Sequence, residues 1–406
     1  MLRFLRALRH RDFRLFFVGQ GVSLVGTWLQ RVAFAWLVYR LTGSALVLGL
    51  VSSIGQLPTL VLSPWAGVFL DRRDRRRMLL LTQSAAMAQA FSLAGLVLWG
   101  VPTATQLAGL ALALGVIDAF DAPARQSLLP AMVGGGDLVN AIALSSLLVN
   151  GARVVGPIIA GFVVVAAGEG ACFFANGLSF GGVIAALLLM RSGSPRSPAS
   201  TSMATDMRDG LRYAWTARPI RQVLGLLALV SLLGISYVVL LPLLAREVLG
   251  GDAQTLGFLT TASGAGAAAG AVFLAGLGRG PVLTRVAGGA ATLFGLALAA
   301  LAQVTSLLPA VAALVAVGFG LMVCTGSTNA TLQTLVADGK RGRVMALYSM
   351  VFVGMVPLGA PLAGALATTL GPANTLMLSG AGCVAGALVF QLRAAPIAEA
   401  GRLTWC

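Results

Sequence analysis

Three charged residues stand inside long apolar stretches, where they could carry chemistry within a membrane: Arg31, Asp118 and Arg153. A charge at the centre of a bilayer costs about 2.5–3.5 kcal/mol on insertion scales, so each needs a partner or a water-filled neighbour. A guanidinium group can hold an anion, and a carboxyl group can exchange a proton. We expect Arg31 to contact a ligand, because no acidic residue lies near it in its own stretch. For Asp118 and Arg153 two interpretations stay open: a structural ion pair between neighbouring helices, or a pair that couples proton exchange to transport.

The composition predicts that membrane helices position these residues. The chain has 406 residues, of which 58% are hydrophobic and 10% charged, with a mean hydropathy of +0.90. These values exclude an ordinary soluble domain of this length. A span needs about 20 apolar residues. Twelve such segments are expected, at 15–39, 46–70, 78–99, 105–126, 139–167, 171–190, 220–244, 256–278, 283–304, 307–333, 344–369 and 372–392.

The distribution of Lys and Arg predicts the orientation. With the N-terminus placed inside, the inner regions hold 24 of the 28 basic residues, whereas only Arg40 and Arg246 fall outside. This asymmetry indicates that both termini are cytoplasmic. The net charge of +15 is spread in short clusters between apolar runs, as topology demands. We therefore expect the lipid bilayer and no nucleic acid as the partner that this charge distribution serves.

The longest polar interval divides the chain into two halves. We expect a bundle of six helices at 1–190, a cytoplasmic linker at 191–219 and a second bundle with a short tail at 220–406. The linker is either plain or ends in a helix lying in the membrane interface. The segment Gly156-Pro157-Ile-Ile-Ala-Gly161 has a counterpart about 205 residues later in Gly359-Ala-Pro361-Leu-Ala-Gly364. Parallel six-span repeats are typical of transporters whose bundles rock around a central site.

Metal, redox and enzymatic chemistry have little support in the sequence. The four cysteines show no paired spacing and His10 is the only histidine. We therefore expect no metal site, no disulfide framework and no cofactor. No nucleophile, base and orienting group come together either, so an enzyme is not expected.

The segment from Gly67 to Arg77 joins an apolar run to five arginines. We expect the second span to end at Asp71, because the arginines cannot cross the membrane cheaply and fix this end in the cytoplasm. If the helix continued, Asp71 and Arg75 would lie at i,i+4. Two interpretations stay open: the cluster is a topological anchor, or it is a clasp that can be made and broken.

This segment resembles the signature of the major facilitator superfamily, whose pattern is matched by Gly67, Asp71, Arg72, Arg75 and Arg76. The resemblance implies a cytoplasmic gate. It also implies that an acidic group at the end of span four, here Asp121, joins the gate.

Further motifs resemble the bacterial branch that contains the enterobactin exporter and macrolide-efflux proteins, a branch of drug:proton antiporters. They are Gly26-Thr27-Trp28-Leu-Gln30, Leu41-Thr42-Gly43-Ser44, Pro123-Ala-Arg125-Gln126, Ala152-Arg153-Val-Val-Gly156-Pro157, Asp209-Gly210-Leu211-Arg212-Tyr213 and Arg341-Gly342-Arg343. The resemblance implies an all-α membrane protein of twelve helices in two pseudo-symmetric bundles, in a bacterial cytoplasmic membrane. Spans one, four, seven and ten then line a central cavity, with Gln30, Arg31, Asp118, Tyr237 and Asn329 on its wall.

Gly156, Pro157 and Gly161 resemble part of the span-five motif of antiporters. The proline frees a backbone carbonyl and the glycines permit close packing, so a hinge is expected there, or packing without directional meaning.

The resemblance implies export of a small-molecule substrate, either a siderophore or an amphipathic drug, by alternating access coupled to protons, in a monomer. The sequence features by themselves indicate a transporter without a direction. Arg31 and the scarcity of acid favour neutral or anionic cargo. Two alternatives remain: a transporter of lipid or lysophospholipid, and a membrane scaffold or sensor that transports nothing.

Overall fold

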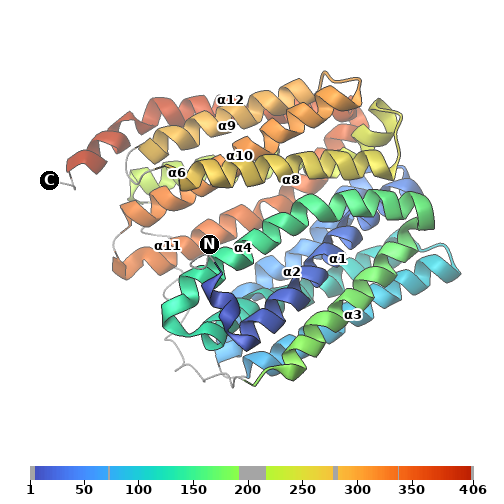
Figure 1. Ribbon diagram of the computed structural model, residues 1–406. Helices are drawn as coiled ribbons and strands as arrows, with labels where there is room; N and C mark the ends of the chain where they lie inside the picture. The colour runs from blue at the N-terminus through green and yellow to red at the C-terminus, as the bar shows by residue number, and fades with distance from the viewer. Residues whose placement is uncertain (1–4, 72–73, 192–215, 278–281, 337, 404–406) are drawn as a thin grey trace. The chain divides into compact units, whose positions relative to one another are not determined.

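The computed structural model describes residues 5–71, 74–191, 216–277, 282–336 and 338–403, and these residues are almost entirely α-helical (Figure 1). Ten of its helices are long and apolar enough to cross a membrane. Two of the ten, Gly136–Leu189 and Arg343–Arg393, run for 54 and 51 residues, more than twice what one crossing needs. The helical membrane fold is confirmed.

Left-handed glycines divide the two long stretches. Gly168 has a φ of 78° and Gly371 a φ of 82°, a region that residues with a Cβ rarely adopt. They fall where the sequence predicts the ends of spans five and eleven. If each long stretch crosses the membrane twice, once on either side of its glycine, ten helices give twelve spans. The expected count of twelve stays a prediction.

Two compact units make up the chain, each with its own contacts. Unit 1 comprises Met1–Gly43, Ile54–Ser200 and Asp252–Thr261, and unit 2 comprises Ser44–Ser53, Thr201–Gly251 and Ala262–Cys406. The expected domain boundaries at 191 and 219 stay a prediction. The expected interfacial helix falls within 192–215, outside the described residues.

Unit 1 is built on a long, twice-broken helix. Its elements are η1 (Arg6–Arg9), α1 (Arg11–Thr42), most of α2 (Ala45–Asp71), α3 (Arg75–Trp99) and α4 (Ala104–Leu189). α4 breaks at Gly134 and Gly168, and both α1 and α3 pack along it (Figure 1). Local signals set the helix ends: Asp74 caps α3, and Thr103 with Gln106 forms a capping box at α4.

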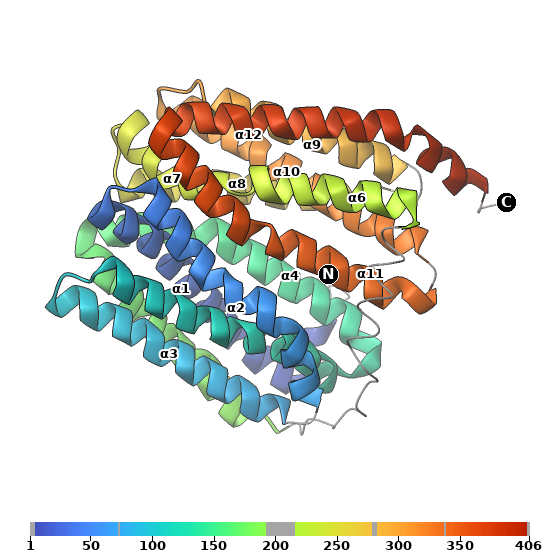
Figure 2. The same ribbon diagram turned by 180° about the vertical axis from the view of Figure 1, so that it is seen from behind.

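Unit 2 begins with one interrupted span. α6 (Arg218–Leu229), the π-helix η2 (Val230–Gly234), α7 (Tyr237–Leu243) and the π-helix η3 (Leu244–Val248) follow one another (Figure 2). α8 (Ala253–Ala275) comes next; its residues up to Thr261 belong to unit 1 and the rest to unit 2. Unit 2 also contains the start of α2, α9 (Val282–Leu301), α10 (Leu307–Leu335), α11 (Asp338–Gly354) and α12 (Val356–Leu403). α9 packs against both α10 and α12.

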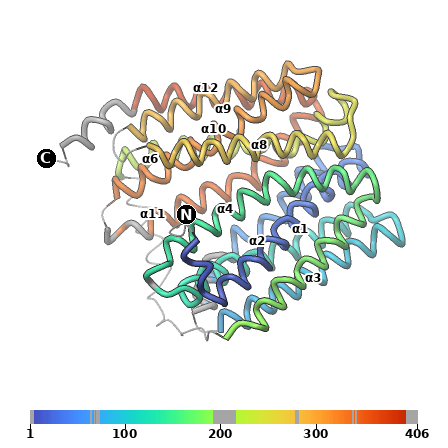
Figure 3. The backbone as a smooth tube through the Cα atoms, in the orientation of Figure 1, coloured from blue at the N-terminus to red at the C-terminus, as the bar shows by residue number. Residues whose placement is uncertain are grey.

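Turn glycines recur at corresponding places in the sequences of the two halves. Figure 3 shows the backbone path of the helices that these turns connect. Gly43 before α2 has a φ of 59°, and Gly250 before α8 has a φ of 60°. Gly168 and Gly371 form a second such pair. The same left-handed glycine conformation at matched turns supports the internal repeat seen in the sequence.

Large apolar side chains cover much of the outside of both units. Trp65 and Trp99 are 69% and 88% exposed, and Leu392 is 81% exposed. A soluble protein rarely leaves so much apolar surface in water. The bilayer is the solvent that such a surface requires.

The N-terminal arm is attached to the turn after the first break of α4. Asp137 is almost fully buried and accepts Arg9 at 2.7 Å, His10 at 2.9 Å and Arg6 at 3.4 Å. The backbone N–H of Ala7 donates to the Asn140 side chain at 2.8 Å. These contacts hold η1 against α4.

Candidate functional site

Arg31 and Arg153 both lie over the ring of Trp28. The guanidinium carbons are 5.2 Å and 5.9 Å from the ring centroid, respectively, within cation–π range. Trp28 and Arg31 come from one face of α1, and Arg153 comes from α4. Arg31 is exposed and Arg153 is half-buried. The structure therefore brings together two of the three intramembrane charges expected to matter, around a ring.

Asp118 is half-buried on α4, on the stretch before the Gly134 break. Among charged groups, Arg31 acts on it most strongly, ahead of Asp121 and Arg125. Within the described residues Asp118 and Arg153 form no ion pair, and the cation that acts on Asp118 is Arg31 instead. Whether Asp118 and Arg153 pair at another stage of a transport cycle stays a prediction.

Gln30 belongs to a buried amide network that joins four stretches of unit 1. Its Nε2 donates to Gln89 on α3 at 3.0 Å, and its Oε1 accepts from Asn176 at 2.8 Å. Gln89 in turn donates to the Leu110 carbonyl at 3.2 Å. Asn176 also accepts from Ser179 at 3.1 Å. Buried amides in such networks hold helices in register, and here both ends of the Gln30 side chain are occupied by protein.

The span-five glycines make the close contacts that their small size permits. A Cβ at Gly156 would collide with the Cβ of Trp28, and one at Gly161 would lie 2.8 Å from the Cα of Gln254. The backbone keeps helical dihedrals at Pro157, because the breaks in α4 are at Gly134 and Gly168. The close packing is confirmed, whereas the hinge role of these three residues stays a prediction.

The predicted end of the second span is confirmed, since α2 ends at Asp71. The helix does not continue through Asp74, because the Asp74 carboxylate accepts the N–H groups of Arg76 and Arg77 and starts α3 as a cap. The condition under which Asp71 and Arg75 would lie at i,i+4 is therefore not met, because a new helix begins at Arg75. The structure does not describe Arg72, nor the side-chain environment of Gly67 and Asp71. The part of these three residues in a gate stays a prediction.

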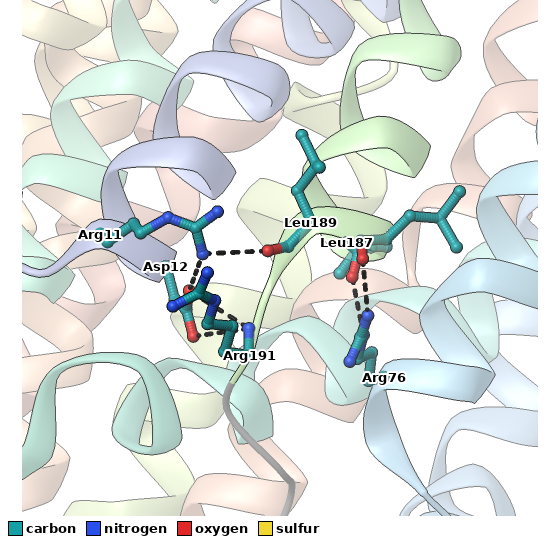
Figure 4. A network of polar contacts seen from close by, with 7 residues as sticks. Arg11, Asp12, Arg76, Leu187, Leu189 and Arg191 are labelled. Atoms are coloured by element: carbon teal, nitrogen blue, oxygen red, sulfur yellow. Dashed lines mark hydrogen bonds and ion pairs between the residues drawn. The ribbon is translucent and has the colours of Figure 1, made fainter.

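Arg75 and Arg76 bond to backbone carbonyls in unit 1. Arg75 donates to Ser127 at 3.1 Å, and Arg76 donates to Leu187 at 2.6 Å and Leu188 at 3.0 Å. Figure 4 shows Arg76 at the end of α4. An arginine there satisfies carbonyls that have no partner within the helix.

The same end of α4 is held from its other side, as Figure 4 also shows. Arg11 donates to the Leu189 carbonyl at 3.0 Å, and the Arg191 N–H donates to Asp12 at 3.2 Å. The beginnings of α1 and α3 are thereby tied to the end of the sixth predicted span.

Asp121 is buried and fully engaged. Its carboxylate accepts Thr82 at 2.8 Å and Gln83 at 2.7 Å, both on α3, and it forms an ion pair with Arg125 one turn further along α4. Asp121 therefore links α3 to α4, near the turn where α3 begins. Its expected place in a gate with Asp71 and Arg75 stays a prediction.

Two expected wall residues lie in unit 2. Tyr237 is buried, with its hydroxyl 2.5 Å from that of Ser263 and its ring edge-on to Phe294. Asn329 is half-buried and accepts Gln333 at 2.6 Å. Neither bears a charge.

An apolar groove of about 740 Å³ lies elsewhere in unit 1, between α3 and the first turns of α4. Phe91, Trp99 and Leu110 help to line it, and it contains none of the expected site residues. Over the described ranges no group of His, Cys, Asp and Glu side chains could hold a metal ion.

Sequence reasoning did not single out Trp28 as a site residue. The signal was present, because an aromatic residue three positions before an arginine shares its helix face. Gln89 and Asn176 were missed for a different reason: isolated amides in apolar segments give no sign of which other amides they face.

Comparisons with known proteins agree with this architecture. A family model described as "Transmembrane secretion effector" matches residues 4–404. The staphyloferrin A transporter of Staphylococcus aureus (strain NCTC 8325 / PS 47) is 24% identical over 379 residues, which cover 93% of this chain and 95% of that protein. The multidrug efflux pump Tap of Mycobacterium tuberculosis (strain ATCC 25618 / H37Rv) is 31% identical over 371 residues, covering 87% and 84%.

Among solved structures, the nucleoside transporter NupG matches with a TM-score of 0.74 at 14% identity, over 95% of this chain and 99% of that one. At this identity the likeness shows the fold alone. Together with the family match over nearly all of the sequence, it leads to one assignment. The chain is a membrane protein of the transmembrane secretion effector family, a branch of the major facilitator superfamily of transporters.

Proposed function

We propose that the protein exports a small organic molecule, a siderophore or an amphipathic drug, across the bacterial cytoplasmic membrane by alternating access. The observation that carries this proposal is the exposed Arg31, which lies about one turn from the middle of the first apolar span. An exposed guanidinium at that depth requires water, and water at that depth requires a cavity. The direction of transport rests on the family and on the efflux proteins among the relatives.

Proton exchange is the energy source that we propose. Asp118 supports it, because this carboxyl group is half-buried and forms no ion pair within the described part of the chain. A carboxyl group free of a fixed cation can lose and regain a proton as the cavity opens to each side. By contrast, Asp121 is held by three partners and is unsuited to the role.

We also propose that the α2–α3 connection works as the cytoplasmic gate, with Gly67, Asp71, Arg72, Arg75 and Arg76 on one side and Asp121 nearby. Arg76 bonds to carbonyl groups at the end of α4, and Arg75 bonds to the Ser127 carbonyl within α4. Such bonds can be exchanged for a carboxylate at little cost, because both are charge-assisted. The proposed orientation places both termini in the cytoplasm, and the proposed working unit is a monomer.

Transport by purified protein in proteoliposomes tests the proposal. The panel contains siderophores, lysophospholipids, and cationic and anionic dyes, each measured with and without a pH gradient. We expect at least one siderophore or dye to accumulate, and to do so faster with the gradient. Accumulation of lysophospholipid alone would favour the lipid transporter, and accumulation of nothing would favour the scaffold.

The Asp118→Asn substitution tests the proton carrier. We expect it to abolish the pH change that substrate drives in the vesicle lumen, while downhill exchange of substrate continues. The control is Asp252→Asn, at the start of α8, which is expected to leave coupling unchanged. Retained coupling in Asp118→Asn would exclude Asp118 as the carrier.

The Asp71→Asn substitution tests the gate. If a clasp stabilises the state closed to the cytoplasm, its loss increases labelling of single cysteines introduced in the inner cavity by a membrane-impermeant maleimide. Labelling equal to that of the parent protein would contradict the clasp and leave the arginines as topological anchors.

A further inference from the structure

The arginines of unit 1 fall into two groups. Arg40 pairs with Glu169 at 2.8 Å, and Arg125 pairs with Asp121. Arg31 and Arg153 have no ion pair or hydrogen bond to protein among the residues that the structure describes. The arginines of this unit that bond to protein use carboxylates, as in Arg40, or backbone carbonyls, as in Arg76. Arg31 and Arg153 instead share an aromatic ring.

The position of the Trp28 ring is fixed by close helix packing. Gly156 lets α4 approach α1 until its Cα lies against the Cβ of Trp28. Arg153 precedes Gly156 by three residues and so projects from the same face of α4. Arg31 follows Trp28 by three residues on α1. The two guanidinium groups are thus brought to the same indole by the two helices that make the contact.

Two positive groups over one ring are not neutralised by that ring. The ring face attracts each cation but has no net charge, and the two cations repel each other in a setting of low dielectric constant. Asp118 offsets part of the charge of Arg31 without forming an ion pair. Even with Asp118 ionised, the three groups carry a net positive charge.

We propose that Trp28, Arg31 and Arg153 form the subsite that holds a carboxylate group of the exported molecule, an inference that rests on the proposed export function. A guanidinium group offers two parallel N–H donors that match the two oxygens of a carboxylate. Arg31 is exposed and offers N–H donors that no described protein group accepts, Arg153 adds charge from the second helix, and the indole gives an apolar edge to the rest of the molecule. The substrate class is therefore an amphipathic organic acid rather than an organic cation, which both arginines repel.

Two dyes with one ring system test this assignment. Carboxyfluorescein and rhodamine 123 share a xanthene core, but the first is an anion and the second a cation. Fluorescence anisotropy with the purified full-length protein in detergent gives the affinity for each. We expect the parent protein to bind carboxyfluorescein at least tenfold more tightly than rhodamine 123.

Substitutions then locate the subsite. Arg31→Gln and Arg153→Gln are each expected to weaken carboxyfluorescein binding about tenfold or more, because a charge-assisted bidentate contact is lost. Arg31→Lys keeps the charge without the planar fork and should fall between Arg31→Gln and the parent. The matched control is Arg14→Gln, another exposed arginine of α1, which should change the affinity by less than twofold. Asp118→Asn should tighten carboxyfluorescein binding, since it removes the competing negative charge.

The outcomes separate this inference from the proposed function. Equal carboxyfluorescein affinity in the parent, Arg31→Gln and Arg153→Gln overturns the subsite, and so does a preference of the parent for rhodamine 123. A parent that transports some compound in proteoliposomes but does not bind carboxyfluorescein also overturns it, while export stands. A parent that transports nothing in the panel contradicts the proposed function. If Arg153→Gln does not fold, Arg31→Gln decides, because the Arg31 side chain is exposed and bonds to no protein group in the described ranges.

Discussion

The glycine contact of Gly156 in unit 1 and that of Gly359 in unit 2 are alike in packing and different in chemistry. A Cβ at Gly156 would collide with Trp28 on α1, and a Cβ at Gly359 would collide with the carbonyl of Leu232 on η2. Each glycine therefore lies against the first predicted span of its own half. The glycines five residues further along, Gly161 and Gly364, are also close-packed. Gly161 packs against the first turn of α8, and Gly364 packs against the first turn of α2.

The side chains around these contacts differ in charge. In unit 1 Arg153 stands three residues before the glycine, and in unit 2 that place is taken by Val356. Where unit 1 has Trp28 and Arg31, the contact in unit 2 has Leu232 and the Ser236 hydroxyl. The two contacts share the backbone packing, but arginines flank only the contact in unit 1. The close contact therefore does not depend on the arginines, and the proposed subsite belongs to unit 1.

The largest effect should come from filling the two glycine contacts. Gly359→Val is expected to lower the thermal midpoint more than Gly156→Val, because a Cβ at Gly359 would meet the Leu232 carbonyl oxygen more closely than a Cβ at Gly156 would meet Trp28, and neither neighbouring atom can rotate away. Overpacking costs about 1–3 kcal/mol, sometimes more. Thermal unfolding in detergent gives both midpoints.

Open glycines provide the controls. A Cβ at Gly151, also on α4, or at Gly289, on α9, would meet nothing within 4 Å. Gly151→Val and Gly289→Val should therefore unfold close to the parent midpoint. Gly156→Val should also lose carboxyfluorescein binding, whereas Gly359→Val that folds should keep it. Equal loss of binding in both would remove the distinction between the units.

A smaller effect is expected in the amide network of unit 1. Gln30→Leu removes one hydrogen-bond partner each from the buried amides of Gln89 and Asn176. Each unsatisfied buried group lowers the free energy of unfolding by about 1–3 kcal/mol. We expect a lower thermal midpoint with an unchanged preference between the two dyes. A changed dye preference with an unchanged midpoint would make Gln30 a ligand contact rather than a structural one.

The smallest effect is expected from Tyr237→Phe in unit 2. It removes one hydrogen bond, to Ser263, and keeps the ring contact with Phe294. A net hydrogen bond contributes about 0.5–1.5 kcal/mol, so the midpoint should fall by less than in Gln30→Leu. Transport in proteoliposomes should persist, and its complete loss would place Tyr237 in direct contact with cargo.

Features that depend on neighbours in the sequence were predictable. The end of α2 at Asp71 follows from a change of composition, and the breaks at Gly168 and Gly371 fall where apolar runs meet. Asp74 shows the limit of this reasoning. Its carboxylate caps α3, which begins at Arg75, and residue spacing alone does not show whether a capping residue or a continued helix prevails.

Features that depend on helix rotation were not predictable. Spacing gives the depth of Asp118 and Arg153 in the membrane but not the direction in which each faces. The guanidinium of Arg153 lies over the Trp28 ring, which packs against Gly156. The cation that acts most strongly on Asp118 is therefore Arg31 and not Arg153. The π-helices η2 and η3 were equally hidden, since an extra residue in a helical turn leaves the apolar run intact.

The attachment of η1 to Asp137 has a practical consequence for anyone who produces this protein. A purification tag or fluorescent protein fused to the N-terminus would begin a few residues from Arg6, whose side chain contacts Asp137. Pulling the arm away would leave a buried carboxylate without its three basic neighbours. A fusion placed away from η1, at the far end of the chain, leaves the contacts of η1 with Asp137 in place and is the better choice for expression.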